Sequence, residues 1–68
     1  MNKNERKQLV EDLIYYKIKS RKTWLVISDE MNISRMTINR WVAGDFLPSH
    51  CFARAIIYYL KDKKENEL

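Results

Sequence analysis

The fold is decided by residues 31–41, which read Met31-Asn32-Ile33-Ser34-Arg35-Met36-Thr37-Ile38-Asn39-Arg40-Trp41. Asn32 follows an apolar stripe, and after glycine, asparagine is the residue that best tolerates the positive φ needed to reverse the chain after a helix. Ser34 then offers a hydroxyl to the unpaired N–H groups of the next turn, a cap worth about 1 kcal/mol. Ile38 and Trp41 recur at helical spacing beyond that cap. The stretch therefore predicts two helices joined by a tight turn.

The faces of these two helices follow from the spacing of their apolar residues. Ile27 and Met31 lie four positions apart and form the inward row of the earlier helix, which Thr23 caps. Ser28 is small enough to let the two helices cross closely. Because Ile38 and Trp41 face inward in the later helix, the residues left outward are Arg35, Met36, Thr37, Asn39 and Arg40.

Two longer helices are predicted on either side of this unit. Before it, a helix from about Asn4 to Lys19 has an inward row of Leu9, Leu13 and Tyr16, with Val10 and Ile14 beside it. After Pro48, a helix capped by Ser49 places Phe52, Ala55, Ile56, Tyr59 and Leu60 inward, with Ile57 and Tyr58 widening the stripe. In the tyrosine pairs Tyr15-Tyr16 and Tyr58-Tyr59, one ring is expected in the core and the other at the surface, since adjacent helical residues point about 100° apart.

Length limits the chain to one small domain. With 68 residues, it buries only about 60% of the surface that its unfolded chain exposes. Residues 63–68 are charged, lack apolar periodicity and are expected to fray. The sequence therefore predicts an all-α domain over residues 1–62 with four helices, a fifth being the alternative.

Charge and composition restrict the function classes. Thirteen Lys and Arg residues against nine Asp and Glu residues give a net charge of +4, which suits a phosphate polymer but equally an ordinary solvated surface. The basic cluster Lys17, Lys19, Arg21 and Lys22 has the same two interpretations, a solvated helix end or a phosphate contact.

Residue types that carry chemistry are scarce. Cys51 is the single cysteine, so no internal disulfide forms, and it is expected to be a small buried or half-buried hydrophobe. His50 has no second histidine to share a zinc site with and is interpreted as a first-turn helix residue. Gly44 is the single glycine, which excludes a glycine-rich phosphate loop. We therefore expect no enzyme activity, cofactor or metal. No apolar run approaches the roughly 20 residues of a membrane span, and the first residues lack a signal-peptide core, so a cytoplasmic location is expected.

Residues 23–49 resemble the phage repressor and Cro family, the lambda-repressor-like or XRE-type helix-turn-helix domains. The resemblance includes the cap Thr23, the apolar positions Ile27, Met31, Ile33, Ile38 and Trp41, and a closing loop of the form Trp-x-x-Gly-x-x-x-Pro-Ser. That loop reads Trp41-Val42-Ala43-Gly44-Asp45-Phe46-Leu47-Pro48-Ser49. The chain departs from the family at Ser28, usually Ala, at Asn32, usually Gly, and at Asp45, which stands in a loop that is more often basic.

The resemblance implies a sequence-specific DNA-binding transcriptional regulator with its helix-turn-helix unit at about 23–41 and residues 35–41 in the major groove. It implies a palindromic operator in double-stranded DNA and a homodimer, which we expect to pair mainly on DNA through Phe46, Leu47 or the outer face of the last helix. The expected base contacts are Arg35, Met36, Asn39 and Arg40. The expected phosphate contacts are Lys22, Thr23, Trp24, Ser34, Thr37, Gly44, Ser49 and His50. For Trp24 the alternative is that its ring packs on the helix over residues 4–19.

A protein-interaction module on the same scaffold is the alternative function. Such a module would be a small phage or mobile-element inhibitor, an antitoxin or an excisionase-like factor. The residues that favour it are the acidic Asp29, Glu30 and Asp45 and the loop residues Phe46 and Leu47, which are expected to be exposed.

Overall fold

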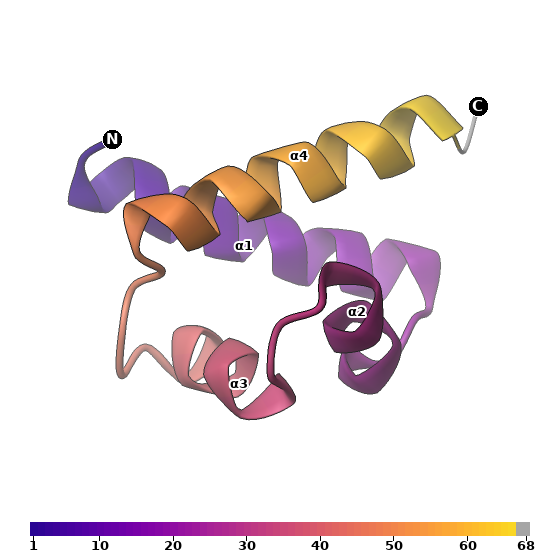
Figure 1. The fold of residues 1–68 in the computed structure, drawn as a ribbon, viewed down its shortest axis with the longest axis horizontal. Coiled ribbons are helices and arrows are strands. Elements are labelled where there is room, and N and C mark those ends of the chain that lie inside the picture. The colour runs from indigo at the N-terminus through magenta and orange to yellow at the C-terminus, as the bar shows by residue number, and fades with distance from the viewer. Residues whose placement is uncertain (67–68) are drawn as a thin grey trace.

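The computed structural model describes residues 1–66, and these fold into four helices without a strand (Figure 1). The helices are α1 (Lys3–Ser20), α2 (Trp24–Met31), α3 (Arg35–Ala43) and α4 (His50–Asn66). The predicted all-α fold is therefore confirmed. None of the helices in this part of the chain has the length and apolar character that crossing a membrane requires.

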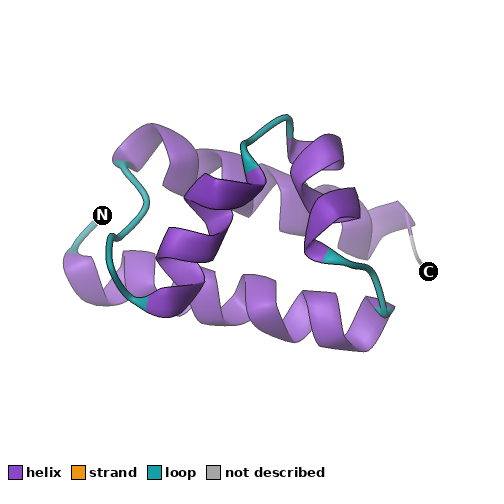
Figure 2. Ribbon diagram, turned by 90° about the horizontal axis from the view of Figure 1, so that it is seen from below, coloured by secondary structure: helices purple, strands orange, loops and turns teal. Residues whose placement is uncertain are grey.

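The two long helices, α1 and α4, pack side by side and run in the same direction (Figure 1). Near their starts, Arg6 Nη1 donates a hydrogen bond of 3.2 Å to the carbonyl oxygen of Pro48. Near their ends, the rings of Tyr16 and Tyr59 meet edge to face, with centroids 5.5 Å apart. In the view from below, the shorter helices α2 and α3 cross in front of this pair (Figure 2).

Each helix contributes one large, completely buried aliphatic side chain to a single core. These residues are Leu13, Ile27, Ile38 and Ile56. Around them lie Val10, Ile33, Trp41 and Tyr59, all buried as well. The inward positions predicted for α2 and α3 from apolar spacing, Ile27, Ile38 and Trp41, are thus confirmed.

The inward face of α4 agrees with the prediction at Ile56 and Tyr59, which are buried, and is narrower than predicted. Ala53, which was not predicted, is completely buried, whereas Phe52 is 40% exposed and Tyr58 is 70% exposed. Ile57 is exposed as well. The inward row runs along Ala53, Ile56 and Tyr59, and α4 packs against α1 and α2.

Local side-chain chemistry sets the start of each helix. Oγ1 of Thr23 accepts a hydrogen bond from the N–H of Val26, and Oγ of Ser34 accepts one from Met36, each at 3.2 Å. Oγ of Ser49 accepts one from Phe52 at 3.3 Å. The three predicted caps are confirmed. The cap of α1, a reciprocal pair between Asn2 and Glu5, was not predicted.

Left-handed residues end the first three helices. Asn32 has a φ of 56°, as predicted, and Gly44 one of 85°. Both turns close with the same pair of hydrogen bonds, in which the N–H of the left-handed residue and the N–H of the next residue reach back to the last turn of the helix. Arg21 also adopts this conformation, with a φ of 62°. The sequence did not predict it, because arginine does not favour a positive φ.

Two further predictions need correction. Residues 63–66, expected to fray, are part of α4, and Lys63 is half-buried there; positions 67 and 68 lie outside the described residues. Cys51 is exposed rather than buried, because it stands in the first turn of α4 about 200° around the helix from Ala53.

Candidate nucleic-acid interface

The outward face of α3 collects the residues that were predicted to contact bases. Ile38 and Trp41 are buried and fix the rotation of the helix, and the ring of Trp41 lies 5.4 Å from that of Phe52. All four predicted base-contact residues are exposed as a result, with Met36 at 63%. They are Arg35, Met36, Asn39 and Arg40.

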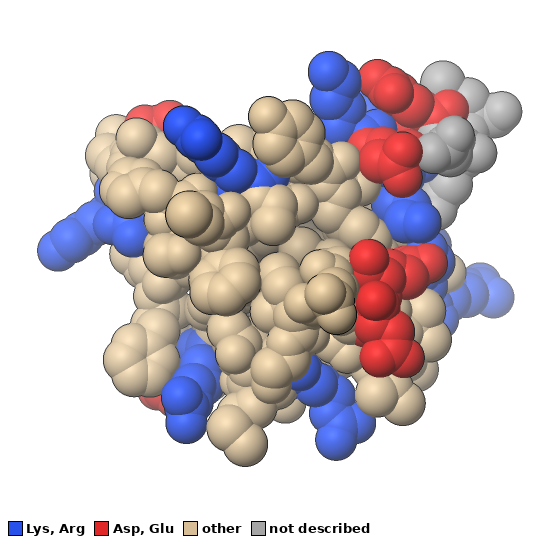
Figure 3. Space-filling model, in the orientation of Figure 1, with Lys and Arg blue, Asp and Glu red and all other residues tan. Residues whose placement is uncertain are grey.

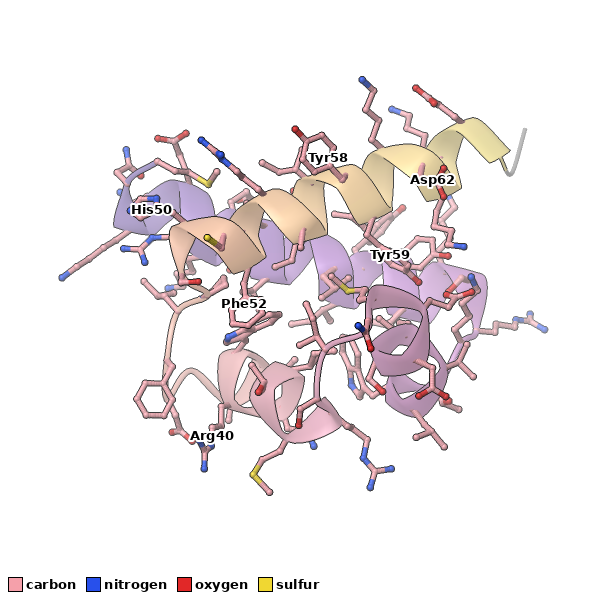
Figure 4. The ribbon with its side chains drawn as sticks, in the orientation of Figure 1. Arg40, His50, Phe52, Tyr58, Tyr59 and Asp62 are labelled. Carbon is pink, nitrogen blue, oxygen red and sulfur yellow. The ribbon has the colours of Figure 1, made fainter. Side chains whose placement is uncertain are left out.

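Charge is distributed unevenly around this face. Helix α3 carries two arginines and no acidic residue, whereas α2 carries Asp29 and Glu30 and no basic residue. Figure 3 shows Lys and Arg side chains projecting from the lower edge, where α3 lies, and acidic side chains gathered over α2. Arg40 points away from the body of the domain at that lower edge (Figure 4). The α3 face is therefore the cationic side of the two-helix unit.

Hydroxyl groups stand at the start of α2, α3 and α4. Thr23, Ser34 and Ser49 each accept one helix N–H, which leaves the O–H of each side chain able to donate to an anion. The remaining first-turn N–H groups of a helix have no intrahelical partner, and they attract phosphate together with the positive end of the helix dipole. These three predicted phosphate contacts are compatible with the structure.

Two of the predicted phosphate contacts make hydrogen bonds within the domain. The N–H of Gly44 donates to the carbonyl oxygen of Trp41 at 3.1 Å, because Gly44 closes the end of α3. The ammonium group of Lys22 donates to the hydroxyl of Tyr16 at 2.8 Å and to the carboxylate of Glu30 at 3.1 Å. Both groups have a structural role here, and their assignment to phosphate stays a prediction.

The other three predicted phosphate contacts differ in exposure. Trp24 is half-buried against the core with Lys17 above its ring, which is the packing alternative. Thr37 is half-buried on α3. His50 is exposed in the first turn of α4, and it lies well apart from Arg40 in Figure 4.

Three lysines of the basic cluster at the end of α1 lie over aromatic rings. Lys17 lies over Trp24, Lys19 over Tyr15 and Lys22 over Tyr16, at 5.4 to 5.7 Å from the ring centroids. These contacts hold the lysines against the surface of the domain. The cluster is packed onto the helix end in this way, and Lys19 and Arg21 are its exposed members.

Sequence reasoning missed the polar cluster around Glu30. Its carboxylate accepts a hydrogen bond of 2.6 Å from the hydroxyl of Tyr59 and ion pairs from Lys22 and Lys63. The bond from Tyr59 is the main cause that holds the pKa of Glu30 below its usual value. Burial, followed by the bond to Glu30, raises the pKa of Tyr59. The bond to Tyr16 raises the pKa of Lys22. The partners of Glu30 lie 8, 29 and 33 positions away in the chain, so no local pattern could have announced the cluster.

The described residues also form open surface hollows. A shallow, open hollow of about 370 Å³ lies along the turn between α2 and α3, lined by Leu25, Ser28, Asp29, Asn32, Ile33, Ser34 and Arg35. Within residues 1–66, no three His, Cys, Asp or Glu side chains are grouped as metal ligands. Comparisons of the chain with protein-family models, with curated proteins and with solved structures give no significant match.

Proposed function

We propose that this protein binds double-stranded DNA sequence-specifically in the cytoplasm and regulates transcription in the manner of a phage repressor or Cro protein. The observation that carries the proposal is the outward face of α3. Arg35, Met36, Asn39 and Arg40 are all exposed there, on a helix that buried Ile38 and Trp41 hold in a fixed rotation.

The chemistry of these four residues suits the edges of base pairs. The major groove is about 12 Å wide and admits one α-helix. Arginine pairs bidentately with guanine, asparagine pairs bidentately with adenine, and an apolar group such as Met36 contacts the methyl group of thymine. Thr23, Ser34 and Ser49, at the starts of α2, α3 and α4, would contact phosphates and so fix the register on the duplex.

The proposed binding unit is a homodimer on a palindromic operator. One α3 reaches only a few base pairs, and two copies related by a two-fold axis would read half-sites about 34 Å apart. Phe46 is 60% exposed in the loop after α3 and supports a contact between copies there. Leu47, beside it, is half-buried and not exposed as expected.

Selection of bound duplexes from a random DNA pool tests this function. The expected result is an enriched palindromic sequence whose enrichment disappears for the triple variant Arg35→Ala, Asn39→Ala, Arg40→Ala. Because all three side chains are exposed, the variant is expected to keep the thermal transition of the wild type. A pool that stays random with folded wild-type protein would refute sequence-specific recognition.

A protein-interaction module is the second candidate. The observation that favours it is apolar exposure beside the same face, where Leu25, Met36 and Phe46 are between 53% and 63% exposed. An inhibitor that binds a protein need not bind DNA at all. Absence of binding to random duplexes at low salt, where phosphate contacts are strongest, would favour this candidate.

A further inference from the structure

Arg40 differs from Arg35 in having an aromatic neighbour. The guanidinium carbon of Arg40 lies over the ring of Phe46, 5.8 Å from its centroid, which is within the range of a cation–π contact. Within residues 1–66, no hydrogen-bond, ionic or aromatic partner holds the side chain of Arg35. Phe46 is 60% exposed, so its ring is not placed by the core.

The backbone places this ring instead. Gly44 reverses the chain with a φ of 85°. The N–H groups of Asp45 and Phe46 then both point back to the carbonyl oxygen of Arg40, at 3.0 and 3.5 Å. The loop therefore closes over the residue whose side chain the ring contacts, and these bonds fix the backbone position from which the ring extends.

We propose that Phe46 is a positioning residue that holds the guanidinium of Arg40 ready for one guanine of the bound site, which makes Arg40 the main source of base discrimination, ahead of Arg35. This inference rests on the proposed function. A ring over the guanidinium leaves the in-plane N–H donors available, and these are the donors that pair with O6 and N7 of guanine. A side chain that is already restrained also loses less conformational freedom on binding.

A double-mutant cycle measures this coupling. Kd would be determined for the wild type, Phe46→Leu, Arg40→Gln and the double variant, on the selected duplex and on one in which the guanine assigned to Arg40 is exchanged with its cytosine. Phe46→Leu is expected to reduce the discrimination between the two duplexes about two- to tenfold in the wild-type background and to leave it unchanged in the Arg40→Gln background. Phe46→Tyr keeps a ring in place and should restore the discrimination. Arg35→Gln should reduce it less than Arg40→Gln does.

The cycle separates positioning from a contact between copies. Loss of a dimer contact would weaken binding to both duplexes and in both backgrounds, without any coupling to Arg40. Equal effects of Phe46→Leu in the two backgrounds would therefore overturn the role of Phe46 while leaving DNA recognition intact.

Relaxation of the arginine Nε–Hε groups in the protein without DNA provides a second readout. The Arg40 group is expected to be more restrained than that of Arg35, and Phe46→Leu should make the two alike. Equal mobility in the wild type would overturn the inference. If the wild-type protein binds all duplexes equally, the proposed function is overturned, and with it the role of Arg40 in reading a guanine. This holds even if relaxation shows that the Arg40 side chain is restrained.

Discussion

The carboxylate of Glu30 accepts a hydrogen bond of 2.6 Å from the hydroxyl of Tyr59, and this bond joins α2 to α4. Lys22, in the loop between α1 and α2, and Lys63 of α4 pair with the same carboxylate. One side chain of the two-helix unit thus contacts α4 and the loop that follows α1. The cluster fixes α2, and the turn that follows it, against the rest of the domain.

Replacing this carboxylate should weaken the domain measurably. Glu30→Gln keeps an oxygen for Tyr59 but removes the charge that pairs with the two lysines, so we expect a loss of about 1 kcal/mol. That corresponds to a melting temperature lower by about 4 to 8 °C in a domain of this size. Circular dichroism would follow the transition. Asp29→Asn is the control, since Asp29 is exposed and has no partner for its side chain within residues 1–66. Identical melting of the two variants would mean that the cluster contributes nothing.

The same cluster should give the domain a defined pH dependence. Because the pKa of Glu30 is lowered in the fold, its stabilisation is present above the ordinary carboxyl value of 4.5 and is lost as the pH falls below it. The pKa of Tyr59 is raised, so its contribution is lost as the pH rises above the ordinary value of 10.0. Melting temperature measured against pH should decline on both sides, with a shallower acid decline for Glu30→Gln. If the melting temperature of Glu30→Gln declined as steeply in acid as that of the wild type, Glu30 would not be the source of the acid dependence.

Trp41 should be indispensable to the fold. Its side chain is only 5% exposed and contacts Phe52, so Trp41→Ala is expected to cost about 3 to 5 kcal/mol. A domain of 68 residues is stable by about 3 to 10 kcal/mol in total. We therefore expect a largely unfolded variant in urea titrations followed by circular dichroism. Met36→Ala, on the opposite face of α3, should unfold like the wild type. A cooperative transition of Trp41→Ala near the wild-type midpoint would show that this ring does not hold the core.

Arg40 should contribute to specificity more than to general affinity. Arg40→Ala is expected to weaken binding to the selected duplex by about 1 to 3 kcal/mol while hardly altering binding to random DNA. Fluorescence anisotropy at one fixed salt concentration gives both values. The matched control is Arg54→Ala, which removes an exposed arginine of α4 and should not change the ratio between the two duplexes. Equal losses on both duplexes for Arg40→Ala would assign it to the phosphate backbone.

Binding should require two copies of the chain. Two domains on adjacent half-sites gain avidity that one domain lacks, so native mass spectrometry is expected to show two proteins per duplex with two half-sites. Scrambling the sequence of one half-site should then lower the affinity of the protein for the remaining half-site. A single bound protein whose affinity ignores the second half-site would exclude the dimeric operator.

The parts of the fold that the sequence predicted correctly are those that local chemistry controls. Thr23, Ser34 and Ser49 cap helices because a hydroxyl beside the first turn is favoured in any context. Asn32 turns the chain because few other residues adopt a positive φ. Arg21 adopts the same conformation against its own preference, at a cost of about 1 to 2 kcal/mol.

The parts that were missed depend on contacts distant in sequence. Burial of Ala53 and exposure of Cys51 depend on which side of α4 faces the other helices. The engagement of Lys22 follows from the arrival of Glu30 and Tyr16 at the same place. Phe46 was identified from the sequence as an exposed loop residue, but its position over Arg40 depends on how the loop closes.

The parallel course of α1 and α4 limits how this chain can be rearranged. The start of α1 and the end of α4 lie at opposite ends of a molecule that is 30 Å long (Figure 1). A circular permutant would therefore need a connecting segment of about nine or more extended residues, because each spans at most about 3.3 to 3.6 Å. A short turn between these two ends would pull the long helices out of register, whereas a break opened in the loop between α3 and α4 would leave their packing in place.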